Sequence, residues 1–221
     1  MKRLILPSVQ AILFDMDGTI FDSETIYCQA WVDTAKQFKQ HFTEQMYDDF
    51  AGVRSAECYR MAAGIFDKNL DMTAFIKAHQ TRVAELKNHN LQVKKGFDSF
   101  FQACIQRQVP IALVTSTRRE VAIHNFNNTN YLQHFDVLVC AEDVSLAKPE
   151  PECYLKACAA LNVDPYHSLA FEDSNPGALA AIRAGCKTVI IPDYLPIEEQ
   201  ITKQAYATAT DFDQLAFQAT S

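Results

Sequence analysis

The chain has 221 residues, enough for one large domain or for a core with a smaller insert. Apolar residues make up 48% and charged residues 21%, which is an ordinary balance for a globular protein. The formal net charge is -7 and there is no run of Lys and Arg, so we expect neither nucleic acid nor a membrane as partner. No stretch has the length of a membrane span, and the apolar run before Pro7 is too short for a signal peptide.

The seven cysteines are an odd number and form no CxxC pair, which argues against a disulfide framework. Free thiols fit a reducing compartment better. We therefore expect a cytoplasmic protein whose partner is a small molecule.

Short apolar segments that end in polar or acidic residues are typical of buried strands. Such segments lie at residues 9–15, 109–117, 135–143, 167–174 and 186–193. Helical stretches separate the later ones, at residues 97–108, 118–128, 151–162 and 176–185. The alternation of strand and helix predicts an α/β fold with a Rossmann-like, doubly wound parallel sheet.

One long gap interrupts this alternation. Between about Ser23 and Leu91 no strand-like run occurs, and the helical segments are 24–38, 55–66 and 73–89. Because seventy residues without structure are implausible in a compact chain, we expect an inserted all-helical cap domain at 23–91. The α/β core, which we expect to be the catalytic domain, would then consist of 1–22 and 92–221.

The stretch "AILFDMDGT" places two acids, Asp15 and Asp17, at the end of a strand. Taken alone, the pair is about as consistent with a turn or a helix cap as with a functional site. An EF-hand calcium loop is excluded, because the glycine is at the fourth position and Ile26 stands where the loop needs Glu.

A second acidic pair, Glu172 and Asp173, ends the strand segment "SLAFED". If the two strands are neighbours, at least three carboxylates converge, and they require a cation to stay ionised together. A site made of oxygen ligands suits Mg²⁺, which keeps several waters and pairs with substrate phosphate. The sequence therefore predicts a magnesium site at this end of the sheet.

Two further stretches offer groups that bind phosphate. Thr115 and Ser116, in "ALVTST", place hydroxyl and backbone N–H groups at a loop that leads into a helix. A role as helix cap is compatible with phosphate binding there. Lys148, in "LAKPEPECY", lies on a segment stiffened by two prolines and could bring a cation to the acids, although a solvated loop is the simpler reading of a lone Lys-Pro.

These four stretches, in this order, resemble the motifs of the haloacid dehalogenase superfamily of phosphotransferases. "FDMDGT" is similar to the first motif, the threonine of "LVTS" to the second, "KPEPECY" to the third and "FEDSNPG" to the fourth. The helical insert resembles the small cap of the branch that contains β-phosphoglucomutase and phosphoglycolate phosphatase-like enzymes. The resemblance implies that the strands of the first and fourth motifs are neighbours.

The resemblance also implies roles for single residues. Asp15 would be the nucleophile that forms an aspartyl-phosphate, and Asp17 the general acid and base. Thr115, Ser116 and Lys148 would hold the phosphoryl oxygens.

The implied Mg²⁺ would be held by Asp15, by the main-chain carbonyl of Asp17 and by Asp173, with Glu172 in support. Such a set supplies the positioning and charge neutralisation on which phosphoryl transfer depends.

Three positions bear on the substrate. Arg54 follows a glycine in the insert, where this family often presents a substrate-loop residue, although a solvated surface arginine is an equal alternative. Tyr27 stands where β-phosphoglucomutases have a histidine that helps control the mutase cycle. This difference favours hydrolysis over mutase activity. The role of Glu24 is left open.

We therefore expect a Mg²⁺-dependent phosphatase that hydrolyses a small phosphorylated metabolite, with a sugar phosphate as one candidate. A hexose-phosphate mutase is the first alternative, and a non-catalytic phosphate-binding regulatory protein is the second. We expect a monomer, with a dimer left open.

Overall fold

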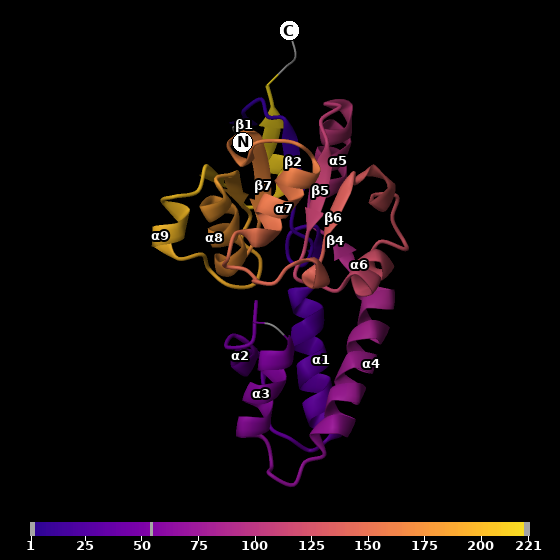
Figure 1. Ribbon diagram of the computed structural model, residues 1–221. Coiled ribbons are helices and arrows are strands. Elements are labelled where there is room, and N and C mark those ends of the chain that lie inside the picture. Colours follow the sequence, from indigo (N-terminus) through magenta and orange to yellow (C-terminus); the bar gives the residue numbers. More distant parts are fainter. Residues whose placement is uncertain (1–2, 54, 219–221) are drawn as a thin grey trace. The chain divides into compact units, whose positions relative to one another are not determined.

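The computed structural model describes residues 3–53 and 55–218 (Figure 1). The chain divides into two compact units: residues 1–21 with 93–221, and residues 22–92. The expected α/β class with a doubly wound parallel sheet and a helical insert is confirmed. Within the described residues, no helix combines the length and the apolar character needed to cross a membrane.

A six-stranded parallel sheet forms the centre of the first unit, in the order β6-β5-β2-β7-β8-β9. Its strands are β2 (Ala11–Phe14), β5 (Ile111–Val114), β6 (Val137–Val139), β7 (Ser168–Glu172), β8 (Lys187–Ile190) and β9 (Ala207–Thr208). The first five lie within the segments expected from the sequence. The strands of the first and fourth motifs, β2 and β7, are neighbours, with Phe14 beside Phe171. Their carboxyl ends therefore meet at one edge of the sheet.

Helices cover both faces of this sheet. They are α5 (Phe97–Gln106), α6 (Arg119–Asn125), α7 (Glu152–Ala160), α8 (Asn175–Ala184) and α9 (Glu199–Thr202). This unit also contains the short 3₁₀ turns η1 (Leu132–His134), η2 (Ala141–Asp143), η3 (Pro165–His167) and η4 (Phe212–Gln214). Successive side chains of a strand point to opposite faces, so each face of β2 contributes to a different core.

Leu13 belongs to a core cluster with residues of α7 and α8, among them Tyr154 and Ala181. Phe14 packs on the other face, where its ring lies 5.5 Å from Phe97 and 4.9 Å from Phe171 between ring centroids. The small residues of α8 allow the helix to lie close to the sheet. Both faces of β2 are buried, which explains its uninterrupted apolar sequence.

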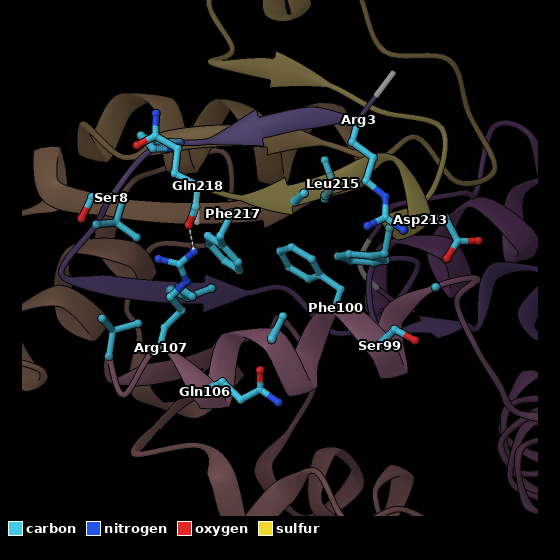
Figure 2. A pocket seen from close by; sticks show the side chains of 18 of the residues that line it. Arg3, Ser8, Ser99, Phe100, Gln106, Arg107, Asp213, Leu215, Phe217 and Gln218 are labelled. Atoms are coloured by element: carbon cyan, nitrogen blue, oxygen red, sulfur yellow. Dashed lines mark hydrogen bonds between the residues drawn. The ribbon is translucent and has the colours of Figure 1, made fainter. Parts of the chain in front are cut away.

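Two further strands, β1 (Leu4–Leu6) and β10 (Leu215–Phe217), pair in parallel as a separate ribbon. The sequence analysis did not anticipate this ribbon. A cavity of about 760 Å³ is lined by residues of α5, β10 and the N-terminal segment (Figure 2). Arg107 lies on its wall, where the guanidinium packs over the Phe217 ring and donates to the carbonyl of Gln218.

The second unit is helical. It contains α1 (Glu24–Gln37), α2 (Glu44–Tyr47), α3 (Ser55–Ile65) and α4 (Met72–Asn90), with α1 packed along α4 (Figure 1). The short strands β3 (Phe21–Asp22) and β4 (Gln92–Val93) form a two-stranded sheet.

Trp31 is buried at the centre of the helical unit, with ring centroids 5.4 Å from Phe42 and 5.1 Å from Phe50. Asp71 caps α4 by accepting hydrogen bonds from the N–H groups of Thr73 and Ala74. An aromatic core and a capped long helix together stabilise this unit.

Candidate active site

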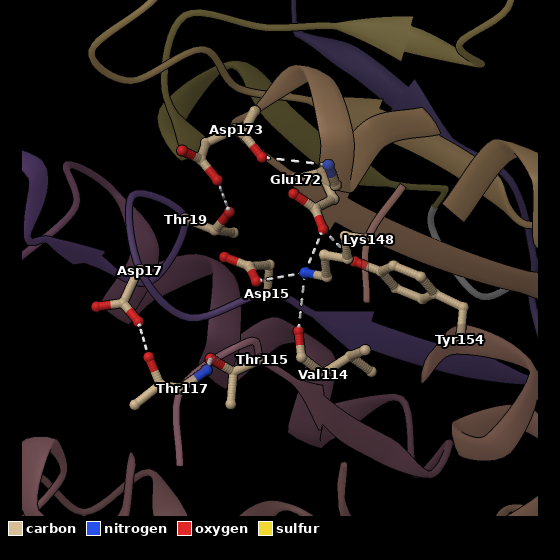
Figure 3. Close-up of polar contacts among 12 residues, drawn as sticks. Asp15, Asp17, Thr19, Val114, Thr115, Thr117, Lys148, Tyr154, Glu172 and Asp173 are labelled. Atoms are coloured by element: carbon tan, nitrogen blue, oxygen red, sulfur yellow. Dashed lines mark hydrogen bonds and ion pairs between the residues drawn. The ribbon is translucent and has the colours of Figure 1, made fainter. Parts of the chain in front are cut away.

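Three carboxylates meet at the carboxyl ends of β2 and β7. Asp15 directly follows β2, and its N–H donates to the carbonyl of Phe171 at 3.1 Å. Glu172 ends β7 and Asp173 follows it. One carboxylate oxygen from each of Asp15, Glu172 and Asp173 lies within 4.8 Å of the other two (Figure 3). The convergence expected from two distant stretches of sequence is thus present in the structure.

Lys148 lies between two of these carboxylates. Its Nζ atom is 2.6 Å from Oδ1 of Asp15, 2.6 Å from Oε1 of Glu172 and 3.2 Å from the carbonyl oxygen of Val114 (Figure 3). The lysine side chain is only 8% exposed. Burial opposes its positive charge, but the two carboxylates outweigh burial and raise the pKa of Lys148. The lysine is therefore a fixed cation within the site.

One lysine does not balance three acids. Burial raises the pKa of Asp15 well above its ordinary value, and the nearby carboxylate of Glu172 raises it further, although Lys148 opposes both effects. Burying several carboxylates near each other is unfavourable without further positive charge. The donor set is entirely oxygen, which is the chemistry that hard divalent cations prefer. The residues present therefore fit a divalent metal ion.

Two glycines make room for the acids. A Cβ atom on Gly18 would lie 2.2 Å from Oδ2 of Asp173, and one on Gly177 would lie 2.0 Å from Oε2 of Glu172. Gly18 also has φ +80°, a conformation that other residues rarely adopt. The glycines of "DGT" and "NPG" thus allow the backbone to approach the site carboxylates closely.

Asp17 contacts the loop that follows β5. Its Oδ2 atom accepts a hydrogen bond of 2.6 Å from the hydroxyl of Thr117 (Figure 3). Thr115 is buried, and its Oγ1 accepts a hydrogen bond of 3.0 Å from the N–H of Thr117. Ser116, between them, is exposed. The structure therefore brings Asp17 and the hydroxyl-bearing loop together, through a residue that was not singled out from the sequence.

Three residues at this site were missed by sequence reasoning. Besides Thr117, Tyr154 of α7 donates to Oε1 of Glu172 at 2.5 Å, and Thr19 donates to Oδ1 of Asp173 at 3.2 Å. Burial and the charge of Glu172 raise the pKa of Tyr154, so it remains a hydroxyl donor. Each lies within one of the four motif stretches, which marks it as a polar candidate, but its partner is visible only in the structure.

The helical unit holds the remaining expected positions. Arg54 lies outside the described residues. Tyr27 accepts a hydrogen bond of 2.8 Å from Nζ of Lys87, which also lies over the tyrosine ring. Glu24 accepts a hydrogen bond of 2.6 Å from the hydroxyl of Tyr47. These contacts form a polar cluster on α1, α2 and α4.

The sequence matches one family model over most of its length. The model describes haloacid dehalogenase-like hydrolases and covers residues 12–191. This range includes every residue of the carboxylate cluster as well as Thr117 and Lys148.

Two relatives with named activities align with most of the chain. A phosphorylated carbohydrates phosphatase from Thermotoga maritima is 29% identical over 185 residues, which cover 82% of this chain and 84% of that protein. A validoxylamine A 7'-phosphate phosphatase from Streptomyces hygroscopicus subsp. limoneus is 35% identical over 179 residues, covering 78% and 81%.

A solved structure has a similar fold. The crystal structure of a Thermotoga maritima protein provisionally named a β-phosphoglucomutase superposes with a TM-score of 0.81 and 26% identity. The match covers 93% of this chain and 96% of that one. The chain therefore belongs to the haloacid dehalogenase-like hydrolase family, and its sequence-based identification as a phosphomonoesterase of that family is confirmed.

Proposed function

We propose that the protein is a Mg²⁺-dependent phosphatase that hydrolyses a small phosphorylated carbohydrate through an aspartyl-phosphate intermediate. The observation that carries the proposal is the buried cluster of Asp15, Glu172 and Asp173, with Lys148 between the first two. The two aligned relatives act on phosphorylated carbohydrates and on validoxylamine A 7'-phosphate, which supports this substrate class. Residues 1–22 and 92–221 would carry the reaction, and residues 23–91 would select the substrate.

In the first step, a carboxylate oxygen of Asp15 attacks phosphorus and the bond to the leaving oxygen breaks. Asp17 gives its proton to that oxygen, which leaves as an alcohol. Dividing the transfer into two displacements lets a side chain replace water as the first nucleophile. Because Lys148 lies 2.6 Å from Oδ1 of Asp15, it holds this carboxylate in place and offsets the charge of an incoming phosphoryl group.

In the second step, Asp17 takes a proton from water, and the resulting hydroxide attacks phosphorus of the aspartyl-phosphate. The acyl-phosphate bond breaks, which regenerates Asp15 and releases inorganic phosphate. Thr115 and Ser116 would bind the phosphoryl oxygens through hydroxyl and N–H groups. The two proton transfers by Asp17 balance over one turnover.

Asp15, the main-chain carbonyl of Asp17, and Asp173 would hold Mg²⁺, with Glu172 in support. When bound, the metal would supply positive charge for the phosphoryl oxygens. Oε1 of Glu172 already accepts hydrogen bonds from Lys148 and Tyr154. Glu172 would therefore act mainly by fixing the lysine.

The direct experiment measures phosphate release from 4-nitrophenyl phosphate and from a panel of sugar phosphates, with and without Mg²⁺. We expect Mg²⁺-dependent release that is lost in Asp15→Asn, with the folded state unchanged by circular dichroism. Reduction of the working enzyme with borohydride should convert a phosphorylated Asp15 to homoserine, which mass spectrometry detects. Full activity of Asp15→Asn would refute the assignment of the nucleophile.

The mutase alternative is separated by offering a sugar 1-phosphate. A mutase would convert it to the 6-phosphate, whereas the proposed hydrolase releases phosphate. Tyr27, which accepts a hydrogen bond from Lys87, argues for hydrolysis because a histidine occupies this position in the mutases. The third hypothesis, a non-catalytic binding protein, predicts no turnover of any phosphate ester.

A further inference from the structure

The hydroxyl of Thr117 and the carboxylate of Asp17 form the short contact that joins the first-motif loop to the loop after β5. The donor Oγ1 lies 2.6 Å from the acceptor Oδ2, although the two residues are 100 positions apart in the sequence. A side-chain hydrogen bond of this length holds its donor and acceptor in a defined geometry. The bond therefore restrains Asp17, which transfers protons in the proposed reaction.

Thr117 is itself fixed by its backbone. Its N–H donates to Oγ1 of Thr115 at 3.0 Å, and its carbonyl accepts from the N–H of Ala141 at 3.1 Å. Thr115 in turn donates from its N–H to the carbonyl of Val139 in the central sheet, at 2.9 Å. The position of the Thr117 hydroxyl is thus set by β5 and by the segment that follows β6.

Asp17 lies in the turn that follows β2, where its backbone forms a β-bridge with Phe21. It follows the buried residue Met16 and precedes Gly18, whose N–H donates to the carbonyl of Phe21 at 2.8 Å. The Asp17 residue is only partly buried. A hydrogen bond to one oxygen selects a single orientation of the carboxyl group.

We propose that Thr117 is a positioning residue that orients Asp17 for its two proton transfers, an inference that rests on the proposed function. As the ester bond breaks, the O–H bond of Asp17 breaks and a new O–H bond forms on the leaving oxygen, and water returns the proton in the second step.

The test compares two substrates of nearly equal shape, phenyl phosphate and 4-nitrophenyl phosphate. Phenolate is the poorer leaving group and needs the acid, whereas 4-nitrophenolate leaves readily without a proton. The quantity to measure is kcat/KM, because it reports the transfer to Asp15 and is insensitive to the later hydrolysis. A residue that merely supports the loop would affect both substrates to the same degree.

Three variants provide the comparison. Thr117→Val keeps the shape and removes the hydroxyl, and Thr117→Ser keeps the hydroxyl. Thr202→Val is the matched control, because its hydroxyl donates to the carbonyl of Glu199 in α9. We expect Thr117→Val to lower kcat/KM for phenyl phosphate by about tenfold to a hundredfold, a part of the usual general-acid contribution. In the same variant, kcat/KM for 4-nitrophenyl phosphate should fall by less than about threefold.

We expect Thr117→Ser and Thr202→Val to keep the wild-type ratio of kcat/KM between the two substrates. Equal losses on both substrates in Thr117→Val would overturn the inference, because they would indicate phosphoryl binding or loop stability. Wild-type values of kcat/KM for both substrates in Thr117→Val would overturn the inference as well. Failure of the proposed function is distinct, since it would appear as absence of turnover in the wild-type protein or as full activity in Asp15→Asn.

Discussion

Nζ of Lys148 lies 2.6 Å from Oδ1 of Asp15 in an ion pair whose side chains are 8% and 9% exposed. The same ammonium contacts Glu172, whose side chain is completely buried. Breaking a buried pair by removing one partner is strongly destabilising, because the remaining charge lies in a poorly solvated place. Lys148 is therefore expected to contribute both to the stability of the α/β unit and to the proposed reaction.

Replacing Lys148 with Met should destabilise the protein by about 3–5 kcal/mol, as is typical for a buried pair that loses one member. Phosphatase activity should be lost at temperatures where the variant is still folded. Urea denaturation with activity assays checks both expectations. Lys203→Met is the matched control, because its pair with Glu199 is largely exposed, and it should leave the midpoint near that of the wild type.

The two helical glycines Gly177 and Gly64 should respond in opposite ways to alanine. Gly64→Ala meets no atom within 4 Å, so it should stabilise the protein by up to about 1 kcal/mol through helix propensity. Gly177→Ala would place its Cβ 2.0 Å from Oε2 of Glu172, so it should destabilise by about 1–3 kcal/mol and impair turnover. Thermal denaturation of both variants decides the matter, and a stabilised, active Gly177→Ala would contradict the close approach.

Asp173→Asn tests the metal site. We expect a chelator to abolish wild-type activity and added Mg²⁺ to restore it, whereas the variant should need on the order of tenfold more Mg²⁺ because it lacks one anionic ligand. A second readout avoids turnover altogether. Mg²⁺ should raise the melting temperature of the wild type and raise that of the variant less, since a ligand stabilises only the state that binds it. Identical metal titrations would count against Asp173 as a ligand.

His79 predicts an acid sensitivity of the helical unit. Burial lowers its pKa from 6.5 to about 4, so the folded protein holds the neutral imidazole while the unfolded chain binds a proton below pH 6.5. The resulting stability is fully present above pH 6.5 and is lost as the pH falls toward 4. In that window His79 should contribute a slope of at most about 1.4 kcal/mol per pH unit.

Urea unfolding of the wild type and of His79→Phe between pH 7 and pH 4 isolates this contribution. The variant should show the shallower dependence on pH. His41→Phe, which changes an exposed histidine, serves as control and should follow the wild type. Equal slopes in wild type and His79→Phe would show that the imidazole titrates normally in the folded state.

The parts of the fold that could be predicted are those that depend on local sequence. Asp15 and Asp173 each follow a buried apolar strand, and parallel strands bring such residues to the same edge. Thr117 and Tyr154 could not be assigned, because a hydroxyl within a loop or helix gains a role only from the side chain opposite it. The pairing of β1 with β10 joins the two ends of the chain, and no local pattern in "LIL" indicates it.

The position of β2 in the sheet has a consequence for synthesis. Ile12 pairs with Ile111 and Leu169, so the central strand is made roughly a hundred to a hundred and fifty residues before its two neighbours. Closing such long loops is slow, whereas contacts within a helical segment form quickly. On the ribosome, residues 22–92 can therefore fold first, whereas β2 stays unpaired until β5 and β7 have been synthesised. A chain released before β7 would carry Asp15 without Glu172 or Asp173, and it would have no reaction centre.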